Sequence, residues 1–213
     1  FITTDSGSLY SLRMNTQGVP LAFVTNQPPA ISSVGTTPAS PAAGQPTWVT
    51  TRVTDDAGVH ISTHRTWLAE IDGAWKKAPL LSAKKVTAPY VGGSIRLWRG
   101  ASGRALRDAP EGDEAAIGEG IETGLSVAIA CPELRVLSAV SLANMKNVEL
   151  PPAVRRVFLC ADNDTDQERG AKVRQQLLAL AVKHFSEGGR DVRLAMPDVM
   201  GADWNDILQG VEG

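Results

Sequence analysis

The sequence predicts an α/β fold, with a parallel sheet of four strands flanked by helices. Two observations support this prediction: from residue 114 onward short apolar runs alternate with helical stretches, and two of the runs end in acidic residues. The runs place strands at 114–118, 135–140, 155–161 and 191–196. Strands separated by helices run parallel, because each helix returns the chain to the end of the sheet where it started.

The segments between these strands have helical patterns. We expect helices over 121–130, near 142–147 and over 166–186, with a final turn after Asp203. The longest of them repeats apolar or aromatic side chains at close to helical spacing. These residues are Val173, Leu177, Leu180, Ala181, His184 and Phe185.

Upstream of residue 108 the sequence alternates in the β manner. Two strands are expected at 48–53 and 59–71, joined by a turn at 55–58, and a third at 94–98. We interpret residues 48–107 as a small basic β-rich subdomain that precedes the α/β domain of residues 108–213.

Residues 1–47 are rich in Ser, Thr, Gly and Pro and carry few charges. Prolines exclude long helices from the second half of this segment. We expect a hairpin near 8–24, followed by an extended linker, and we assign no function to it.

The composition, with 43% hydrophobic and 21% charged residues, is that of a soluble globular protein. No apolar run approaches the roughly 18 residues that a membrane span needs. We therefore expect a cytoplasmic protein without a membrane partner. Cys131 and Cys160 are too few for a disulfide framework, and Cys160 is expected to be a buried, reduced thiol. His60 and His64 are interpreted as surface or groove residues.

Basic residues are concentrated in one stretch, although the net charge is only −2. The window 76–107 contains eight of them and no acidic residue, whereas the rest of the chain is strongly acidic. Segregation of charge on this scale predicts an anionic partner such as nucleic acid. The eight are Lys76, Lys77, Lys84, Lys85, Arg96, Arg99, Arg104 and Arg107.

Acidic residues follow two of the predicted strands. Glu119 comes after the first strand, and Asp162 and Asp164 come after the third. The carboxyl ends of parallel strands meet at one edge of a sheet, where open α/β folds place their sites. Carboxylates that converge there repel one another unless a cation lies between them. The pattern predicts a site for Mg²⁺ or Mn²⁺, and hence chemistry on phosphates.

Several neighbours are expected to support these acids. Gly118 and Gly120 leave room for a phosphate or metal beside Glu119. Glu122 either assists the site or interacts with the N-terminus of the next helix. Asp166 either joins the site or caps the long helix. Asp203 and Asp206 either support a second metal, or Asp203 caps the last helix.

Other common motifs are absent from the sequence. The glycines after the first strand lack the spacing of a dinucleotide-binding loop, and there is no Gly-x-x-x-x-Gly-Lys-Ser/Thr phosphate-binding loop. No Gly-x-Ser-x-Gly elbow indicates a nucleophilic hydrolase.

Four ordered motifs resemble the Toprim domain, which is shared by bacterial DnaG-type primases, topoisomerases, OLD-type nucleases and RecR-like repair proteins. The resemblance is greatest to the Toprim module of primases encoded by phages and plasmids. The motifs are Glu-Gly-Ile-Glu-Thr (119–123), Leu-Pro-Pro-x-Val-Arg-Arg (150–156), Ala-Asp-Asn-Asp (161–164) and Asp-Trp-Asn-Asp (203–206).

The resemblance implies a Toprim-like catalytic domain over residues 108–213, with Glu119, Asp162 and Asp164 as catalytic and metal-binding acids. It implies primer synthesis from nucleoside triphosphates on a single-stranded DNA template, and a replicative helicase as a further partner. The six basic residues expected to follow the template are Lys76, Lys77, Lys84, Lys85, Arg96 and Arg99. Trp67 and Trp98 are either base-stacking residues or core residues, of which the core reading is favoured.

Two alternatives remain open at this point. A Toprim nuclease would use similar acids to cut phosphodiesters, and a non-catalytic DNA-binding module would retain the acids without turnover. A topoisomerase is not favoured, because Tyr10 and Tyr90 both lie outside the α/β part.

Overall fold

The computed structural model describes residues 2–3, 9–10, 35–37, 47–87, 89–163 and 168–210. Three short strands lie near the start of the chain: β1 (Ile2–Thr3), β2 (Leu9–Tyr10) and β3 (Gly35–Thr37). Most of the expected hairpin near 8–24, and most of the linker after it, lie outside the described residues.

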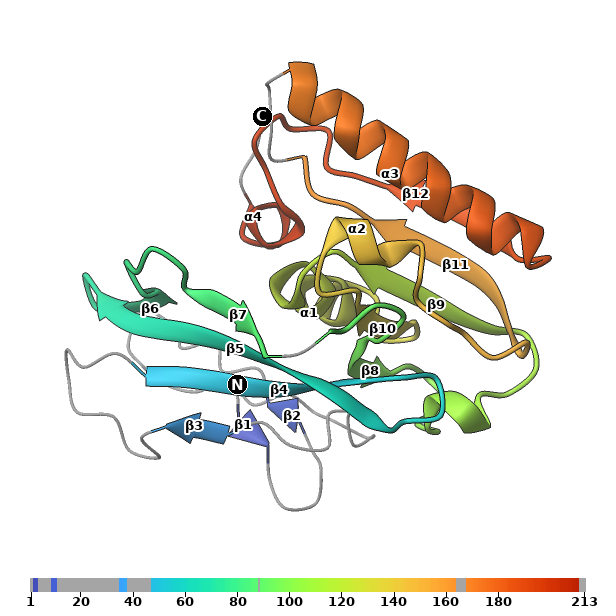
Figure 1. Cartoon of the computed structure of the whole chain (residues 1–213), viewed down its shortest axis with the longest axis horizontal. Coiled ribbons are helices and arrows are strands. Elements are labelled where there is room, and N and C mark those ends of the chain that lie inside the picture. The colour runs from blue at the N-terminus through green and yellow to red at the C-terminus, as the bar shows by residue number, and fades with distance from the viewer. Residues whose placement is uncertain are drawn as a thin grey trace.

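The principal sheet has five strands in the order β12-β11-β9-β10-β8 (Figure 1). Four of them run parallel, as predicted. The strands are β8 (Ile95–Arg99), β9 (Asp113–Gly118), β10 (Arg135–Ser138), β11 (Val154–Cys160) and β12 (Asp191–Ala195).

The fifth strand corrects one prediction. Residues 94–98 were assigned to the β-rich subdomain, but β8 pairs antiparallel with β10 at the edge of the principal sheet. Ile95 and Leu97 are fully buried there, and this apolar face favours the packed position over an isolated hairpin.

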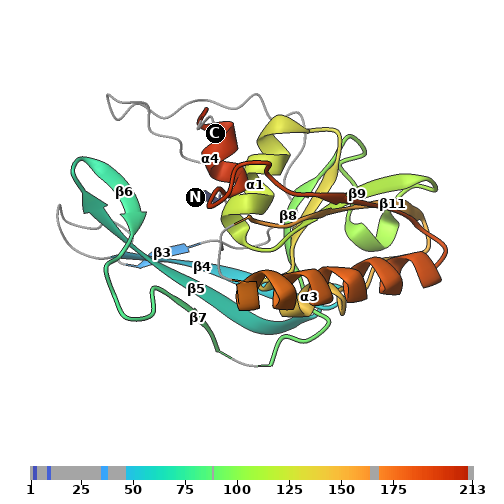
Figure 2. The same cartoon turned by 90° about the horizontal axis from the view of Figure 1, so that it is seen from above.

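Helices cover both faces of the principal sheet. They are α1 (Ile121–Ala130), α2 (Leu142–Met145), α3 (Glu168–Glu187) and α4 (Trp204–Leu208), and a short 3-10 turn (Leu106–Asp108) precedes β9. Figure 2 shows α3 along one side of the molecule and α1 on the side of β8. None of the helices in the described ranges has the length and apolar character needed to cross a membrane.

The buried face of α3 agrees with the predicted one at Ala181 and Phe185 and differs from it at Val173 and Leu180. Leu178, Ala181 and Phe185 are buried, whereas Val173 and Leu180 are about half exposed. Because α3 packs mainly over β11 and β12 and against α2, one narrow stripe of the helix is covered and its flanks remain in solvent.

A second, antiparallel sheet, which we call the basic sheet, is formed by β3 together with β4 (Thr47–Thr54), β5 (His60–Ile71), β6 (Ala74–Lys77) and β7 (Lys84–Val86). β3 pairs with the free side of β4. β5 pairs with β4 along one edge and with β6 and β7 along the other. The predicted turn at 55–58 is present, where the Asp55 carboxylate accepts a hydrogen bond from the Val59 amide at 2.7 Å.

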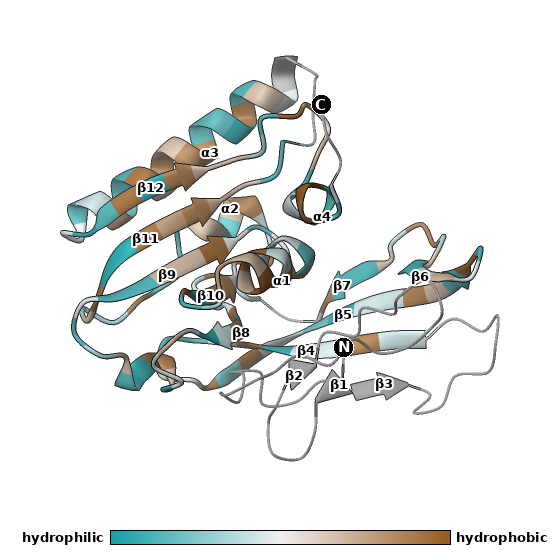
Figure 3. Ribbon diagram, turned by 180° about the vertical axis from the view of Figure 1, so that it is seen from behind, coloured by the Kyte–Doolittle hydropathy of each residue, from teal (hydrophilic) through white to brown (hydrophobic). Residues whose placement is uncertain are grey.

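The two sheets share one hydrophobic core. Val49 and Val53 of β4 lie in the same buried cluster as Leu97 of β8 and Leu125 of α1. Figure 3 shows the apolar strands of the principal sheet beside α1, with β4 and β5 beyond them. Cys160 belongs to this cluster, and burial raises the pKa of its thiol to about 12, so the predicted buried thiol is confirmed.

Candidate functional site

The carboxyl ends of the parallel strands form one edge of the principal sheet, which we call the acidic edge. Gly118 at the end of β9 lies opposite Cys160 at the end of β11, and the Glu119 amide donates to the Cys160 carbonyl at 3.2 Å. Glu119 and Asp162 therefore follow neighbouring strands at this edge. The side chains of both are partly buried.

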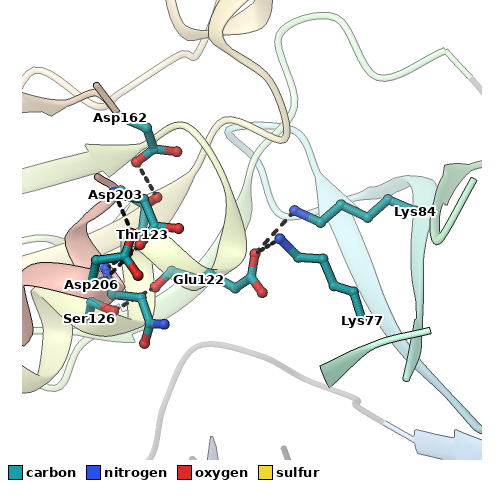
Figure 4. Close-up of polar contacts among 9 residues, drawn as sticks. Lys77, Lys84, Glu122, Thr123, Ser126, Asp162, Asp203 and Asp206 are labelled. Atoms are coloured by element: carbon teal, nitrogen blue, oxygen red, sulfur yellow. Dashed lines mark hydrogen bonds and ion pairs between the residues drawn. The ribbon is translucent and has the colours of Figure 1, made fainter. Parts of the chain in front are cut away.

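The Asp162 carboxylate is held in place by a helix hydroxyl. Thr123 of α1 is almost fully buried, and its Oγ1 donates to Oδ1 of Asp162 at 2.6 Å (Figure 4). This hydrogen bond fixes Oδ1 of Asp162 and thereby orients Oδ2 of the same carboxylate. Thr123 was not among the predicted site residues. Its position four residues after Glu119, in the first turn of α1, is the sequence feature that could have indicated its role.

Gly118 is required for close packing at this edge. A Cβ on Gly118 would lie 2.8 Å from the backbone nitrogen of Gly124, so β9 and α1 approach too closely for any side chain. A Cβ on Gly120 would meet nothing within 4 Å. Gly120 therefore leaves open space beside Glu119, whereas Gly118 serves packing instead of access.

Asn163 ties the end of β11 to the loop that follows β12. Its side-chain nitrogen donates to the carbonyls of Pro197 and Val199, and its backbone bonds to Gly201 and Ala202. The Trp204 indole donates to the Ala161 carbonyl at 3.0 Å. These bonds bring α4 to the acidic edge, although its sequence lies some forty residues away.

Asp203 and Asp206 form a capping box at the start of α4. Oδ1 of Asp203 accepts from the amides of Asn205 and Asp206, and Oδ2 of Asp206 accepts from the Asp203 amide at 3.1 Å. Each carboxylate therefore uses one oxygen to begin the helix. The capping role expected for Asp203 is therefore confirmed, and Asp206 shares it.

Glu122 links α1 to the basic sheet. Its carboxylate lies 2.6 Å from Nζ of Lys77 and 3.3 Å from Nζ of Lys84 (Figure 4). Burial alone would raise the pKa of Glu122, but its hydrogen bond to Lys77 and the charges of both lysines outweigh burial, and the pKa falls below its ordinary value. Burial likewise opposes the charge on Lys77, and the bond to Glu122 raises its pKa overall.

The other residues predicted to bind the template do not share the position of Lys77 and Lys84 beside Glu122. Arg96 is partly buried and donates to the carbonyls of Asp55 and Asp56, so it holds the β4–β5 turn. Arg99 donates to the Gly103 carbonyl at 3.3 Å. Lys76 and Lys85 are exposed, but they lie on the opposite face of the basic sheet from Lys77 and Lys84, because strand residues alternate between faces.

His64 is not the surface residue that the sequence suggested. It is 5% exposed and lies on the face of β5 that points toward α1. Burial, assisted by the charge of Lys84, lowers its pKa to about 4, so the imidazole is neutral at pH 7. Within the part of the chain that the structure describes, its Nδ1 has no hydrogen-bond partner.

The described part of the acidic edge offers carboxylate oxygens, the donors that Mg²⁺ and Mn²⁺ prefer. Asp164 and Asp166 lie outside the described residues. Among the residues that are described, no three acids, histidines or cysteines are grouped closely enough to hold a metal by themselves. Glu119 and Asp162 supply carboxylate oxygens of the kind that such an ion takes.

The comparisons with known proteins agree with this geometry. Residues 114–212 match the family described as Toprim domain. Comparison with curated proteins found no relative that matches this sequence.

Solved structures with a similar fold include a DNA primase domain from Pseudomonas aeruginosa (TM-score 0.51, 14% identity, covering 76% of this chain and 46% of that one). The E. coli primase catalytic core has a TM-score of 0.51 at 16% identity and covers 76% of this chain and 48% of that chain. This chain therefore spans about half the length of those relatives.

Residues 114–212 of this chain form a Toprim domain. Its mixed α/β sheet, flanked by helices, resembles the corresponding part of primase catalytic cores. The principal sheet, formed by β8–β12, is therefore called the Toprim sheet from here on.

Proposed function

We propose that this chain is the core of a primase, which joins nucleotides on a single-stranded DNA template. The observation that carries the proposal is the acidic edge of a Toprim domain facing a basic sheet, with Glu119 and Asp162 on neighbouring strand ends. The resemblance to primase cores supports the fold, and the activity, substrates and partners are our proposal.

Glu119, Asp162 and Asp164 are proposed to hold Mg²⁺ or Mn²⁺, with Asp203 and Asp206 nearby. When bound, the metal would neutralise the triphosphate and lower the pKa of the attacking hydroxyl. The chain's own contribution is to hold the carboxylates in place, through Thr123 for Asp162 and through the strand register for Glu119.

Lys77 and Lys84 are proposed to face the template and the nucleotide phosphates. They lie on the face of the basic sheet that meets α1, and each remains more than 40% exposed despite its contact with Glu122. Residues 48–107 would thus position the DNA, and residues 108–213 would carry out the chemistry, with β8 contributed to the Toprim sheet by the first of these segments. A replicative helicase is a further proposed partner.

The test is primer synthesis from ribonucleoside triphosphates on single-stranded DNA with Mg²⁺ or Mn²⁺. Asp162→Asn, which keeps the shape and removes the charge, should reduce synthesis by roughly two orders of magnitude. Asp198→Asn is the matched control, because Asp198 is exposed in the loop after β12. Equal synthesis by wild type and Asp162→Asn would reject the catalytic assignment.

The same reactions distinguish the alternatives. Metal-dependent degradation of the labelled strand, without synthesis, would identify a Toprim nuclease. DNA binding without turnover of either kind would leave a non-catalytic module.

A further inference from the structure

The basic residues of the second sheet are divided between two faces. Lys77 and Lys84 reach Glu122 on the face toward α1. Lys76 and Lys85 are their direct neighbours in the chain and therefore point to the opposite face. Both lysine pairs lie on the edge formed by β6 and β7, so positive charge continues over this edge from one face to the other.

The face of the basic sheet that points away from α1, which we call the outer face, carries two tryptophans side by side. Trp48 of β4 pairs directly with Trp67 of β5, and their ring centroids are 6.3 Å apart. The Arg65 guanidinium lies 5.6 Å from one ring and 5.7 Å from the other, and Nζ of Lys85 lies 5.9 Å from the Trp67 ring. The two ring planes are tilted by 46° to each other, and both tryptophans are partly exposed.

This face carries charge of one sign only. Arg52 is exposed and lies beside Thr63, and so shares the face with Arg65. Among the β4–β7 residues that alternate onto this side, every charged residue is basic. Within the described part of the chain, Nε of Arg65 has no hydrogen-bond partner, and the guanidinium carbon lies within 6 Å of both ring centroids.

We propose that single-stranded DNA leaving the acidic edge crosses the β6–β7 edge and binds this outer face, where bases stack on Trp48, Trp67 and Arg65 and phosphates contact Arg52, Lys76 and Lys85. Aromatic rings interleaved with cations are the means by which proteins bind single strands without reading their sequence. The inference rests on the proposed function, since it extends the path of the same template. It gives a function to Lys76 and Lys85, which point away from the acidic edge.

The test compares oligonucleotides of two lengths. A short dT oligonucleotide of roughly 6 nucleotides reaches one face only, and one of roughly 20 reaches both. Binding is measured by fluorescence anisotropy at several salt concentrations. Lys85→Ala should weaken binding of the long oligonucleotide about three- to fivefold and reduce its salt slope by roughly 0.7. The short one should lose less, because it can bind on the face toward α1 alone.

Lys183→Ala is the matched control, because Lys183 is an exposed lysine on α3, on the far side of the Toprim sheet. As a second measurement, a long oligonucleotide carrying 5-iododeoxyuridine is irradiated and the attached residue is found by mass spectrometry. We expect attachment at Trp48 or Trp67.

Three outcomes decide the matter. If the wild type binds neither oligonucleotide, the proposed template role fails and this inference fails with it. If the wild type binds and makes primers but Lys85→Ala behaves like Lys183→Ala, only the outer face is rejected. Strong binding of the long oligonucleotide with attachment at neither tryptophan would also reject it.

Discussion

The two sheets use their polar residues in different ways. In the Toprim sheet, parallel strands deliver Glu119 and Asp162 to one edge, because every parallel strand ends on the same side. In the basic sheet, antiparallel strands distribute one basic segment over two faces, so that Lys84 meets Glu122 and Lys85 meets Trp67. Parallel strands thus concentrate charge at an edge, and antiparallel strands divide it.

The largest expected effect concerns a buried ion pair inside the Toprim sheet. Arg135 is 1% exposed, and its guanidinium lies 2.8 Å from the Asp113 carboxylate. Asp113→Ala should lower the free energy of unfolding by about 3–5 kcal/mol, because it leaves a buried charge without its partner. The measurement is urea denaturation followed by circular dichroism.

Asp108→Ala is the control for that change, because Asp108 forms an exposed pair with Arg107 at 3.5 Å. It should cost well under about 1 kcal/mol. If Asp113→Ala costs no more than Asp108→Ala, the Toprim sheet does not depend on its buried charges.

The next largest effect concerns His64, which lies on the face of the basic sheet that points toward α1, the inner face. The His64 pKa is about 4 in the folded protein and 6.5 ordinarily, so the unfolded chain binds a proton that the folded chain does not as pH falls through this range. Stability should therefore fall from pH 6.5 toward pH 4, by roughly 2–3 kcal/mol for this group. His64→Leu should remove that part of the pH dependence.

His60→Asn provides the comparison, because His60 is exposed on the same strand. Its denaturation curves should keep the wild-type pH dependence. An unchanged pH dependence in His64→Leu would show that the inner face is less buried in solution than in the structure.

A smaller effect is expected at the acidic edge itself. Thr123→Val removes the hydroxyl that bonds to Asp162 and should lower Mn²⁺ affinity about tenfold, as loss of outer-shell partners usually does. Isothermal titration calorimetry measures this directly, and Thr123→Ser should restore the affinity. Ser126→Ala is the control, since the Ser126 hydroxyl donates to the Glu122 carbonyl within the same helix and not to Asp162 among the described contacts. Equal affinity in Thr123→Val would mean that the carboxylate needs no support.

The smallest effect concerns the contact between the two sheets. Glu122 has a lowered pKa, so its contribution to stability is present above about pH 4.5 and is lost as pH falls below it. Lys77 has a raised pKa, so its share is lost only above about pH 10.5. Glu122→Gln should cost less than about 1 kcal/mol at pH 7, because the pair is partly exposed.

Comparing urea denaturation of Glu122→Gln and wild type at pH 7 and pH 3.5 checks this. The difference between them should shrink at the lower pH. A difference that persists unchanged at pH 3.5 would show that packing, and not charge, joins the sheets at this point.

The sequence predicted the parallel strands well, because apolar runs such as 157–161 are buried or half-buried on both faces of the sheet, as central parallel strands are. It assigned β8 to the wrong sheet, because a five-residue strand fits either sheet until its buried partners are known. For α3 the sequence predicted burial correctly at Ala181 and Phe185 but not at Val173 and Leu180, since the elements that pack against a helix decide which side is covered.

Within the candidate site, the position of Glu119 and Asp162 was predictable from strand ends alone. The bond from Thr123 was not, because it depends on how α1 turns toward β11. Nor did the basic window show which lysines face the acids, since that is fixed by the pairing of Lys84 with Thr66 and of Lys77 with Leu68.

The joint cluster of Val49, Val53, Leu97 and Leu125 sets a limit on dissection of the molecule. A truncated protein that starts at residue 108 would lose β8, leave the outer edge of β10 unpaired and uncover the apolar side of α1. Such a fragment should aggregate. The smallest stable fragment should therefore begin before β4, because β4 supplies part of the core that covers α1 and β8.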